Sequence, residues 1–117
     1  MAERLDSYLP LSSASFYILL ALAREDLHGY GIMQEIAKQS EGIYKLGPGT
    51  LYDNLEKLIR AGWVHELGPR RGDEDPRRRY YRLSNAGRDL LRAETERLTQ
   101  VVREARSRLR IPNPRRV

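Results

Sequence analysis

The sequence predicts a mainly α-helical fold with a two-stranded β-hairpin and a long C-terminal helix. Three observations predict it. Residues 13–62 hold three segments with apolar residues at helical spacing, residues 63–83 hold two short segments of strand composition, and a charged segment with heptad spacing starts at residue 85. With 117 residues the chain has the length of one domain, and a chain this short often completes its apolar burial by dimerising.

The composition excludes several classes of protein. The chain has no cysteine, which excludes disulfides and thiol chemistry and fits a reducing compartment, so we expect a cytoplasmic protein. No apolar run approaches the roughly 20 residues that span a bilayer. The N-terminal apolar stretch is short and follows no basic segment, so it is not predicted to be a signal peptide, and no membrane partner is expected.

Charge is distributed unevenly along the chain, although the net charge is only +5. Residues 1–69 carry six Lys/Arg and nine Asp/Glu, whereas residues 70–117 carry fifteen Lys/Arg and seven Asp/Glu. Eighteen of the 21 basic residues are arginine, whose planar fork suits phosphate and guanine edges. The basic second half favours a polyanionic partner, while an arginine-rich solvated surface is the alternative.

The first two helices are predicted from apolar spacing. One covers residues 13–24, with Ser12 or Ser13 as its N-cap, and residues 25–27 form a short connector. The second covers residues 28–39. Its expected buried side consists of Tyr30, Ile32, Met33, Ile36 and Ala37. A loop with room for a short strand follows at residues 42–47.

The third helix has a start, a body and a stop within residues 47–64, GPGTLYDNLEKLIRAGWV. Gly47 falls at the N-cap and Pro48 at the first helical position, where its missing N–H is not needed. Gly62 stands where helices commonly end. The expected buried face consists of Leu51, Leu55, Leu58 and Ile59, which leaves a polar face headed by Thr50, Asp53, Asn54 and Lys57.

Two predicted strands, residues 63–67 and 77–83, enclose the polar turn segment GPRRGDEDP. Alternation places Tyr81 and Leu83 on one face of the second strand, and Tyr80 and Arg82 on the other. Ser84 is then expected to cap the last helix, which should run to about residue 110, before Pro112.

The last helix has the a/d spacing of a coiled coil. The seam positions are Leu91, Thr95, Leu98, Val102, Ala105 and Leu109. We expect residues 84–110 to pair with a second subunit, with folding back onto the domain as the alternative. The expected organisation is a DNA-binding domain over residues 1–83, a dimerisation helix over 84–110 and a disordered tail over 111–117.

Three helices, a hairpin and a long final helix follow one another in the order of a winged helix-turn-helix, whose third helix enters the DNA major groove. The expected DNA contacts on that helix are Thr50, Tyr52, Asp53, Asn54 and Lys57; for each, the alternative is an exposed residue on a solvated helix, or, for Tyr52, packing beside Leu51. The hairpin would be the wing, and its expected contacts are Arg70, Arg71, Arg77, Arg78 and Arg79. The acidic tip, residues 73–75, is read as a solvated turn, with pairing to arginines or cation binding as alternatives.

Three motifs together resemble the PadR-like family of winged-helix transcriptional regulators. They are HGYG at 28–31, GTLY at 49–52 and YRLSNAG at 81–87, and the resemblance runs from about residue 11 to residue 91. It implies a dimeric repressor of palindromic promoter DNA, in parts of the family released by a small-molecule effector, and the single C-terminal helix resembles the compact subfamily. Gly47 replaces a serine common in the family.

Some compact members carry an aromatic residue in the last helix that stacks on bound drugs, and this last helix has none. An effector pocket near the first helix would instead use Phe16, Tyr17 and Tyr8, with core packing as the alternative. No cofactor is expected. With two histidines, no cysteine and no phosphate-binding glycine loop, an enzyme is not predicted. A protein-binding module and a non-specific architectural DNA-binding protein remain as alternative functions.

Overall fold

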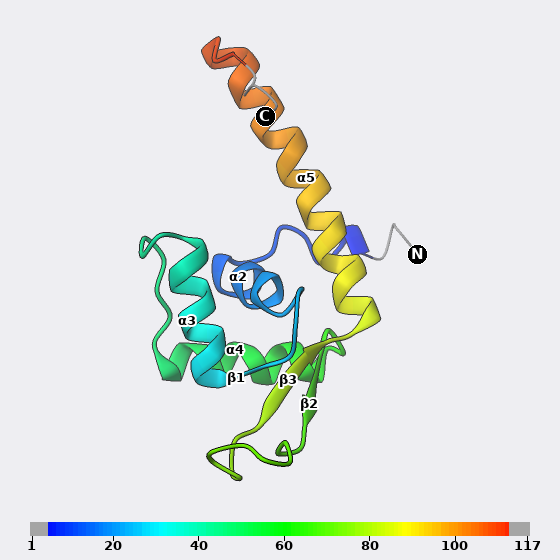
Figure 1. Ribbon diagram of the computed structural model, residues 1–117. Helices are drawn as coiled ribbons and strands as arrows, with labels where there is room; N and C mark the ends of the chain where they lie inside the picture. The colour runs from blue at the N-terminus through cyan, green and yellow to red at the C-terminus, as the bar shows by residue number, and fades with distance from the viewer. Residues whose placement is uncertain (1–4, 113–117) are drawn as a thin grey trace.

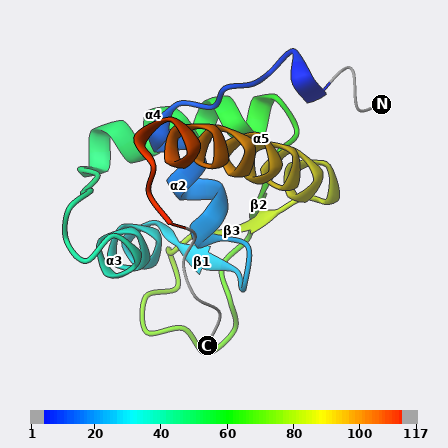
Figure 2. The ribbon, with the colours of Figure 1, turned by 90° about the horizontal axis from the view of Figure 1, so that it is seen from above.

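The computed structural model describes residues 5–112. Its elements, in chain order, are α2 (Ser13–Ala21), β1 (Leu27–His28), α3 (Gly29–Gln39), α4 (Pro48–Arg60), β2 (Val64–Leu67), β3 (Tyr80–Leu83) and α5 (Asn85–Leu109). Figure 1 shows α2 at the centre, with α3 and α4 around it and the hairpin beyond α4. The distal part of α5 projects from the opposite end (Figure 1). Seen along the perpendicular view in Figure 2, α5 passes over the rest of the domain.

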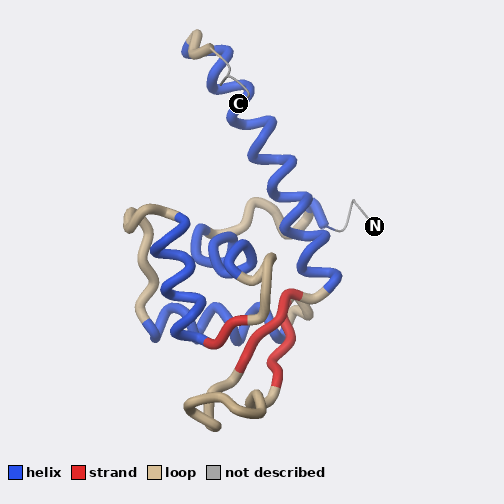
Figure 3. Tube along the Cα trace, viewed as in Figure 1, coloured by secondary structure: helices blue, strands red, loops and turns tan. Residues whose placement is uncertain are grey.

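The fold class predicted from the sequence is confirmed, with one additional strand. The sheet has three antiparallel strands in the order β1-β3-β2 (Figure 3). Leu27 pairs with Tyr81, and Val64 pairs with Leu83. The predicted connector at residues 25–27 therefore leads directly into a strand, which the sequence did not reveal because two residues are too few to show alternation.

Helix α4 packs its leucine face into the core, as its spacing predicted. Leu51, Leu55 and Leu58 are each at most 5% exposed, and Ile59 is partly buried. They join residues of α2, α3, β2 and β3 in one hydrophobic cluster, which also includes Leu90 from the second turn of α5. The first turns of α5 and the DNA-binding head thus share a single core.

Local capping explains where the helices begin. The side chains of Ser12, His28 and Ser84 accept hydrogen bonds from the backbone N–H groups of residues 15, 31 and 87. As predicted, Gly47 occupies the N-cap of α4 and Pro48 is the first residue of the helix. Gly62 follows α4 with φ +86°, a left-handed conformation that glycine adopts without a steric penalty.

Several predicted details were wrong. Helix α2 ends at Ala21 rather than near residue 24, and the loop at 42–47 contains no strand in the described chain. Strand β3 begins at Tyr80, so residues 77–79 belong to the loop. Tyr30 was expected on the buried side of α3 but is 61% exposed, because it lies two residues from Ile32 and therefore on another side of the helix.

Besides the shared core, close backbone and hydrogen-bond contacts hold α5 against the head. An added Cβ at Gly87 would lie 2.1 Å from the carbonyl oxygen of Trp63, so only glycine permits this approach. About two turns further on, the buried carboxylate of Glu94 accepts hydrogen bonds from the backbone N–H of Leu11 (2.8 Å) and from Arg97. Within residues 5–112, no helix is long and apolar enough to cross a membrane.

Candidate nucleic-acid interface

The exposed face of α4 presents polar side chains to solvent. Thr50, Asp53 and Lys57 are exposed, while the leucines on the other side of the same helix are buried. The Asn54 amide donates a hydrogen bond to the Thr50 carbonyl oxygen (2.8 Å), so it is turned back onto its own helix. Because Gly47 has no side chain to cap α4, the N–H groups of the first turn and the positive end of the helix dipole stay available to an anion.

Tyr52 links the start of α4 to the start of α3. Its ring is about half exposed, and its hydroxyl lies so close to Gly29 that an added Cβ there would be 2.2 Å from the oxygen. The sequence left open whether Tyr52 packs inward; the structure shows it packed against the N-terminus of α3. Two motifs found separately in the sequence, residues 28–31 and 49–52, therefore meet at this contact.

A pocket of about 240 Å³ opens where α3, α4 and the wing converge. It is lined by His28, Gly29, Tyr30, Tyr52, Arg77, Arg78, Arg79 and Tyr81. Hydroxyl, imidazole and guanidinium groups are the donors that bind phosphate oxygens in protein–DNA complexes. Sequence reasoning missed His28 and Tyr30 as candidates; their proximity to the wing arginines follows from the pairing of β1 with β3.

The role of His28 as a helix cap fixes the tautomer of its neutral ring. Its Nδ1 accepts a hydrogen bond from the Gly31 N–H (3.1 Å), so the neutral ring carries its proton on Nε2. Burial, and then the positive charge of Arg78, lower the pKa of His28 below its ordinary value. The neutral ring retains one N–H donor for a ligand.

The wing is anchored to the head through Asp26, which the sequence analysis assigned to a connector. The carboxylate of Asp26 accepts hydrogen bonds from Arg82 (2.8 and 3.1 Å) and from Arg70 (3.2 Å). Arg82, more than Arg70, holds the pKa of Asp26 below its ordinary value. Arg70 also lies over the ring of Tyr80, 4.3 Å from its centroid. Arg70, a predicted DNA contact, thus has an intramolecular role as well.

The acidic tip of the wing is not the solvated turn that was expected. Asp73 pairs with Arg78 (3.3 Å) and its side chain is only 5% exposed. Asp75 pairs with Arg77 (3.4 Å) and accepts a hydrogen bond from the Arg77 backbone N–H. Pairing with neighbouring arginines, one of the two alternatives considered, is therefore what the structure shows for both aspartates.

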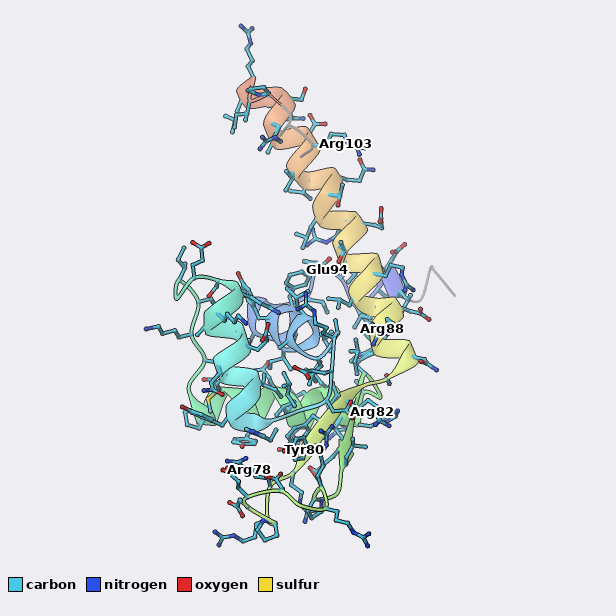
Figure 4. The ribbon with its side chains drawn as sticks, viewed as in Figure 1. Arg78, Tyr80, Arg82, Arg88, Glu94 and Arg103 are labelled. Atoms are coloured by element: carbon cyan, nitrogen blue, oxygen red, sulfur yellow. The ribbon has the colours of Figure 1, made fainter. Side chains whose placement is uncertain are left out.

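The remaining wing arginines are free of such pairs. Among residues 5–112, no carboxylate lies within ion-pair distance of Arg71 or Arg79, and both side chains are exposed. Figure 4 shows Arg78, Tyr80 and Arg82 along the wing, at the opposite end of the molecule from Arg103. The described residues contain no group of three His, Cys, Asp or Glu that could hold a metal ion.

The predicted seam of α5 divides into a buried and an exposed part. Leu91 belongs to the core of its own protomer, with 7% of its surface exposed. Further along, Val102 is 51% exposed and Leu109 is 69% exposed, and Thr95 and Ala105 are also exposed. The distal helix projects away from the domain (Figure 1), and the described part of the chain covers these side chains only in part.

The aromatic residues considered for an effector pocket pack against other rings. Tyr17 stacks on Tyr44, with ring centroids 4.6 Å apart, and meets Phe16 edge-on, while Tyr8 meets the ring of Trp63 edge-on. Phe16 also borders an apolar pocket of about 300 Å³. The other lining residues come from α5 and are Thr95, Leu98, Thr99 and Val102.

A three-helix head with an antiparallel wing and a projecting terminal helix defines a winged-helix protein. The chain belongs to the PadR-like family of transcriptional regulators, whose family model matches residues 18–93. The resemblance stated from the three sequence motifs is thereby confirmed.

Two curated relatives are similar over most of this chain. The transcriptional regulator Rv3488 of Mycobacterium tuberculosis is 30% identical over 93 residues, which cover 80% of this chain and 82% of the relative. An uncharacterized 37.1 kDa protein in transposon TN4556 of Streptomyces fradiae is 36% identical over 90 residues. These residues are 77% of this chain but only 24% of that protein, so the chain spans about a quarter of its length.

Solved structures share the fold. A PadR family transcription regulator from Clostridium difficile superposes with a TM-score of 0.70 at 20% identity, covering 84% of this chain and 98% of that one. Bacillus subtilis PadR in complex with operator DNA has a TM-score of 0.61 at 22% identity, covering 71% of this chain and 46% of that one.

Proposed function

We propose that this protein is a sequence-specific DNA-binding regulator that acts as a homodimeric repressor at a palindromic promoter site. The observation that carries the proposal is the convergence, at one end of the molecule, of the polar face of α4 with an arginine-rich wing. The match to a PadR structure solved with operator DNA supports the same function.

In the proposed complex, α4 enters the major groove, and Thr50, Asp53 and Lys57 face the DNA from its exposed side. The wing follows the flanking backbone, where Arg71 and Arg79 are available for phosphates without breaking an ion pair. The pocket lined by His28 and Tyr30 would take a phosphate between these two contacts.

Dimerisation through the distal part of α5 would place two heads on successive major grooves, about 34 Å apart. The exposed Val102 and Leu109 support this pairing, because a partner helix would cover them. A small molecule bound between Phe16 and α5 would change the spacing of the heads. Affinities for DNA and for such an effector would then be reciprocally coupled.

The test is binding of the purified protein to duplex DNA from its own upstream region, titrated with salt and with unrelated competitor duplex. We expect tight binding that survives the competitor and weakens as salt rises. Equal loss of binding to any duplex would favour an architectural protein, and no binding at low salt would favour a protein-interaction module.

Two substitutions test the position of the interface. Lys57→Ala and Arg79→Ala should each weaken binding to the upstream duplex while leaving the thermal unfolding transition in place, because both side chains are exposed. Lys38→Ala, in the last turn of α3, is the matched control for loss of one positive charge. If all three variants bind like the wild type, the DNA-binding surface lies elsewhere.

A further inference from the structure

The wing loop contains two arginines that are paired with aspartates and two that are not. Arg77 and Arg78 each face an aspartate of the same loop, at 3.4 and 3.3 Å, whereas Arg71 and Arg79 face none among the described residues. Asp73 is almost fully buried. The pair between Asp75 and Arg77 is more exposed, and Asp75 also accepts the backbone N–H of Arg77 at 2.9 Å.

The aspartates are ionised whenever the protein would meet DNA. The nearby Tyr80 hydroxyl, followed by a backbone N–H and Arg78, holds the pKa of Asp73 below its ordinary value. The Arg77 backbone N–H does the same for Asp75. Both are therefore charged at neutral pH, and each neutralises one arginine of the surface that would approach the phosphates.

A carboxylate and a phosphate are alternative partners for the same guanidinium group, because both accept its N–H donors through anionic oxygens. A phosphate that approaches Arg77 or Arg78 also approaches the aspartate paired with that arginine. The attraction of the guanidinium group is then offset by the repulsion of the carboxylate. These two arginines therefore add little to the affinity for unrelated DNA. Arg71 and Arg79, in contrast, are available to the phosphates of any duplex.

We propose that Asp73 and Asp75 are specificity-determining residues, which act as internal substitutes for phosphate and suppress binding to unrelated DNA. A duplex held in register by α4 would make enough other contacts to overcome this repulsion, whereas unrelated DNA would not. The inference rests on the proposed DNA-binding function and adds to it a reason for carboxylates at the tip of a DNA-binding wing.

The experiment compares three substitutions, each of which removes one negative charge from the same turn: Asp73→Asn, Asp75→Asn and Glu74→Gln. Asparagine retains an oxygen that can accept the backbone hydrogen bonds of the turn, so the charge is the main change. Glu74 lies between the two aspartates, is exposed and has no ion pair within the described chain, which makes its variant the matched control. Because Asp75 is more exposed than Asp73, its variant remains informative if Asp73→Asn impairs folding.

Dissociation constants are measured for an unrelated duplex and for the upstream duplex between about 50 and 200 mM salt, the range over which phosphate contacts are readily counted. For unrelated duplex, we expect Asp73→Asn and Asp75→Asn to tighten binding and to steepen the plot of log K against log salt. The expected increase in slope is about one unit per released arginine. Glu74→Gln should leave the slope unchanged, and affinity for the upstream duplex should change less than affinity for unrelated duplex.

Equal effects of all three substitutions would overturn the inference, since net charge alone would then explain them. An unchanged ratio of specific to unrelated affinity in both aspartate variants would also overturn it. Failure of the proposed function would appear separately, as a wild-type protein that does not prefer its upstream duplex. The salt slopes on unrelated duplex still test the release of the arginines in that case.

Discussion

Helices α4 and α5 are both amphipathic, but the protomer covers the apolar side of only one of them. In α4, Leu51, Leu55 and Leu58 are all buried, and the exposed side is polar. In α5, Leu90 is buried, while Val102 and Leu109 are 51% and 69% exposed. Helix α4 therefore exposes a polar face to solvent or to an anion, whereas the distal part of α5 exposes an apolar face.

The difference separates two kinds of recognition within one chain. A polar face beside arginines suits the phosphates and base edges of DNA. An apolar seam at heptad spacing, on a helix whose other positions are charged, suits a second copy of the same helix. The contacts at Gly87 and Glu94 join the first three turns of α5 to the head.

The largest expected effect comes from charging the seam. Leu98→Glu combined with Val102→Glu should convert the proposed dimer to a monomer, because pairing would bury unpaired carboxylates. Gln100→Glu combined with Ser107→Glu adds the same charge at exposed positions opposite the seam and should leave the dimer intact. Sedimentation velocity distinguishes the two, and a double-glutamate seam variant that stays dimeric would place the interface elsewhere.

The second effect compares the two apolar faces directly, in the monomeric seam variant. Adding Leu55→Ala should lower the free energy of unfolding by about 2–5 kcal/mol, because it removes a buried side chain from the core. Adding Leu109→Ala should change it by less than about 0.5 kcal/mol, because that side chain is exposed in the protomer. Urea titrations measure both, and comparable losses would mean that distal α5 has cover within the protomer.

The smallest effect concerns Glu94, at the boundary between the buried and exposed parts of α5. Its hydrogen bonds with Arg97, and to a lesser extent with the Leu11 N–H, hold its pKa below the ordinary 4.5. A lowered carboxyl pKa adds stability that is present above pH 4.5 and is lost as the pH falls through the folded-state value. Glu94→Gln should therefore cost about 1 kcal/mol at pH 7 and less at pH 3.

Thermal unfolding at the two pH values measures this difference. Glu96→Gln, which removes an exposed carboxyl group two residues away, is the matched control and should show no such pH dependence. A stability loss for Glu94→Gln that is equal at pH 7 and pH 3 would show that the ionised pair with Arg97 does not stabilise the docked N-terminal segment.

Elements with complete local signals were predictable from the sequence. The sequence of α4 contains a start signal at Pro48, a termination signal at Gly62 and leucines at helical spacing. The structure confirms all three. Ser84 likewise marked the start of α5. The ten predicted DNA-contact residues gather on α4 and the wing, at one end of the molecule, but their contacts with DNA stay a prediction.

Features that join distant parts of the chain were not predictable. Strand β1 has two residues and exists only because β3 pairs with it. Asp26 accepts hydrogen bonds from Arg82, 56 residues away in the sequence, and from Arg70, 44 residues away. No local pattern in residues 25–27 predicts either contact. The pocket that brings Tyr30 beside the wing arginines also exists only in the packed fold.

The sequence by itself determined the helices, the wing and the excess of arginine, because helical periodicity, capping residues and charge are local properties of the chain. The tertiary structure decided which arginines of the wing are paired with aspartates and which are free. It also decided where α5 leaves the core. Both depend on distances between side chains that only the packed fold brings together.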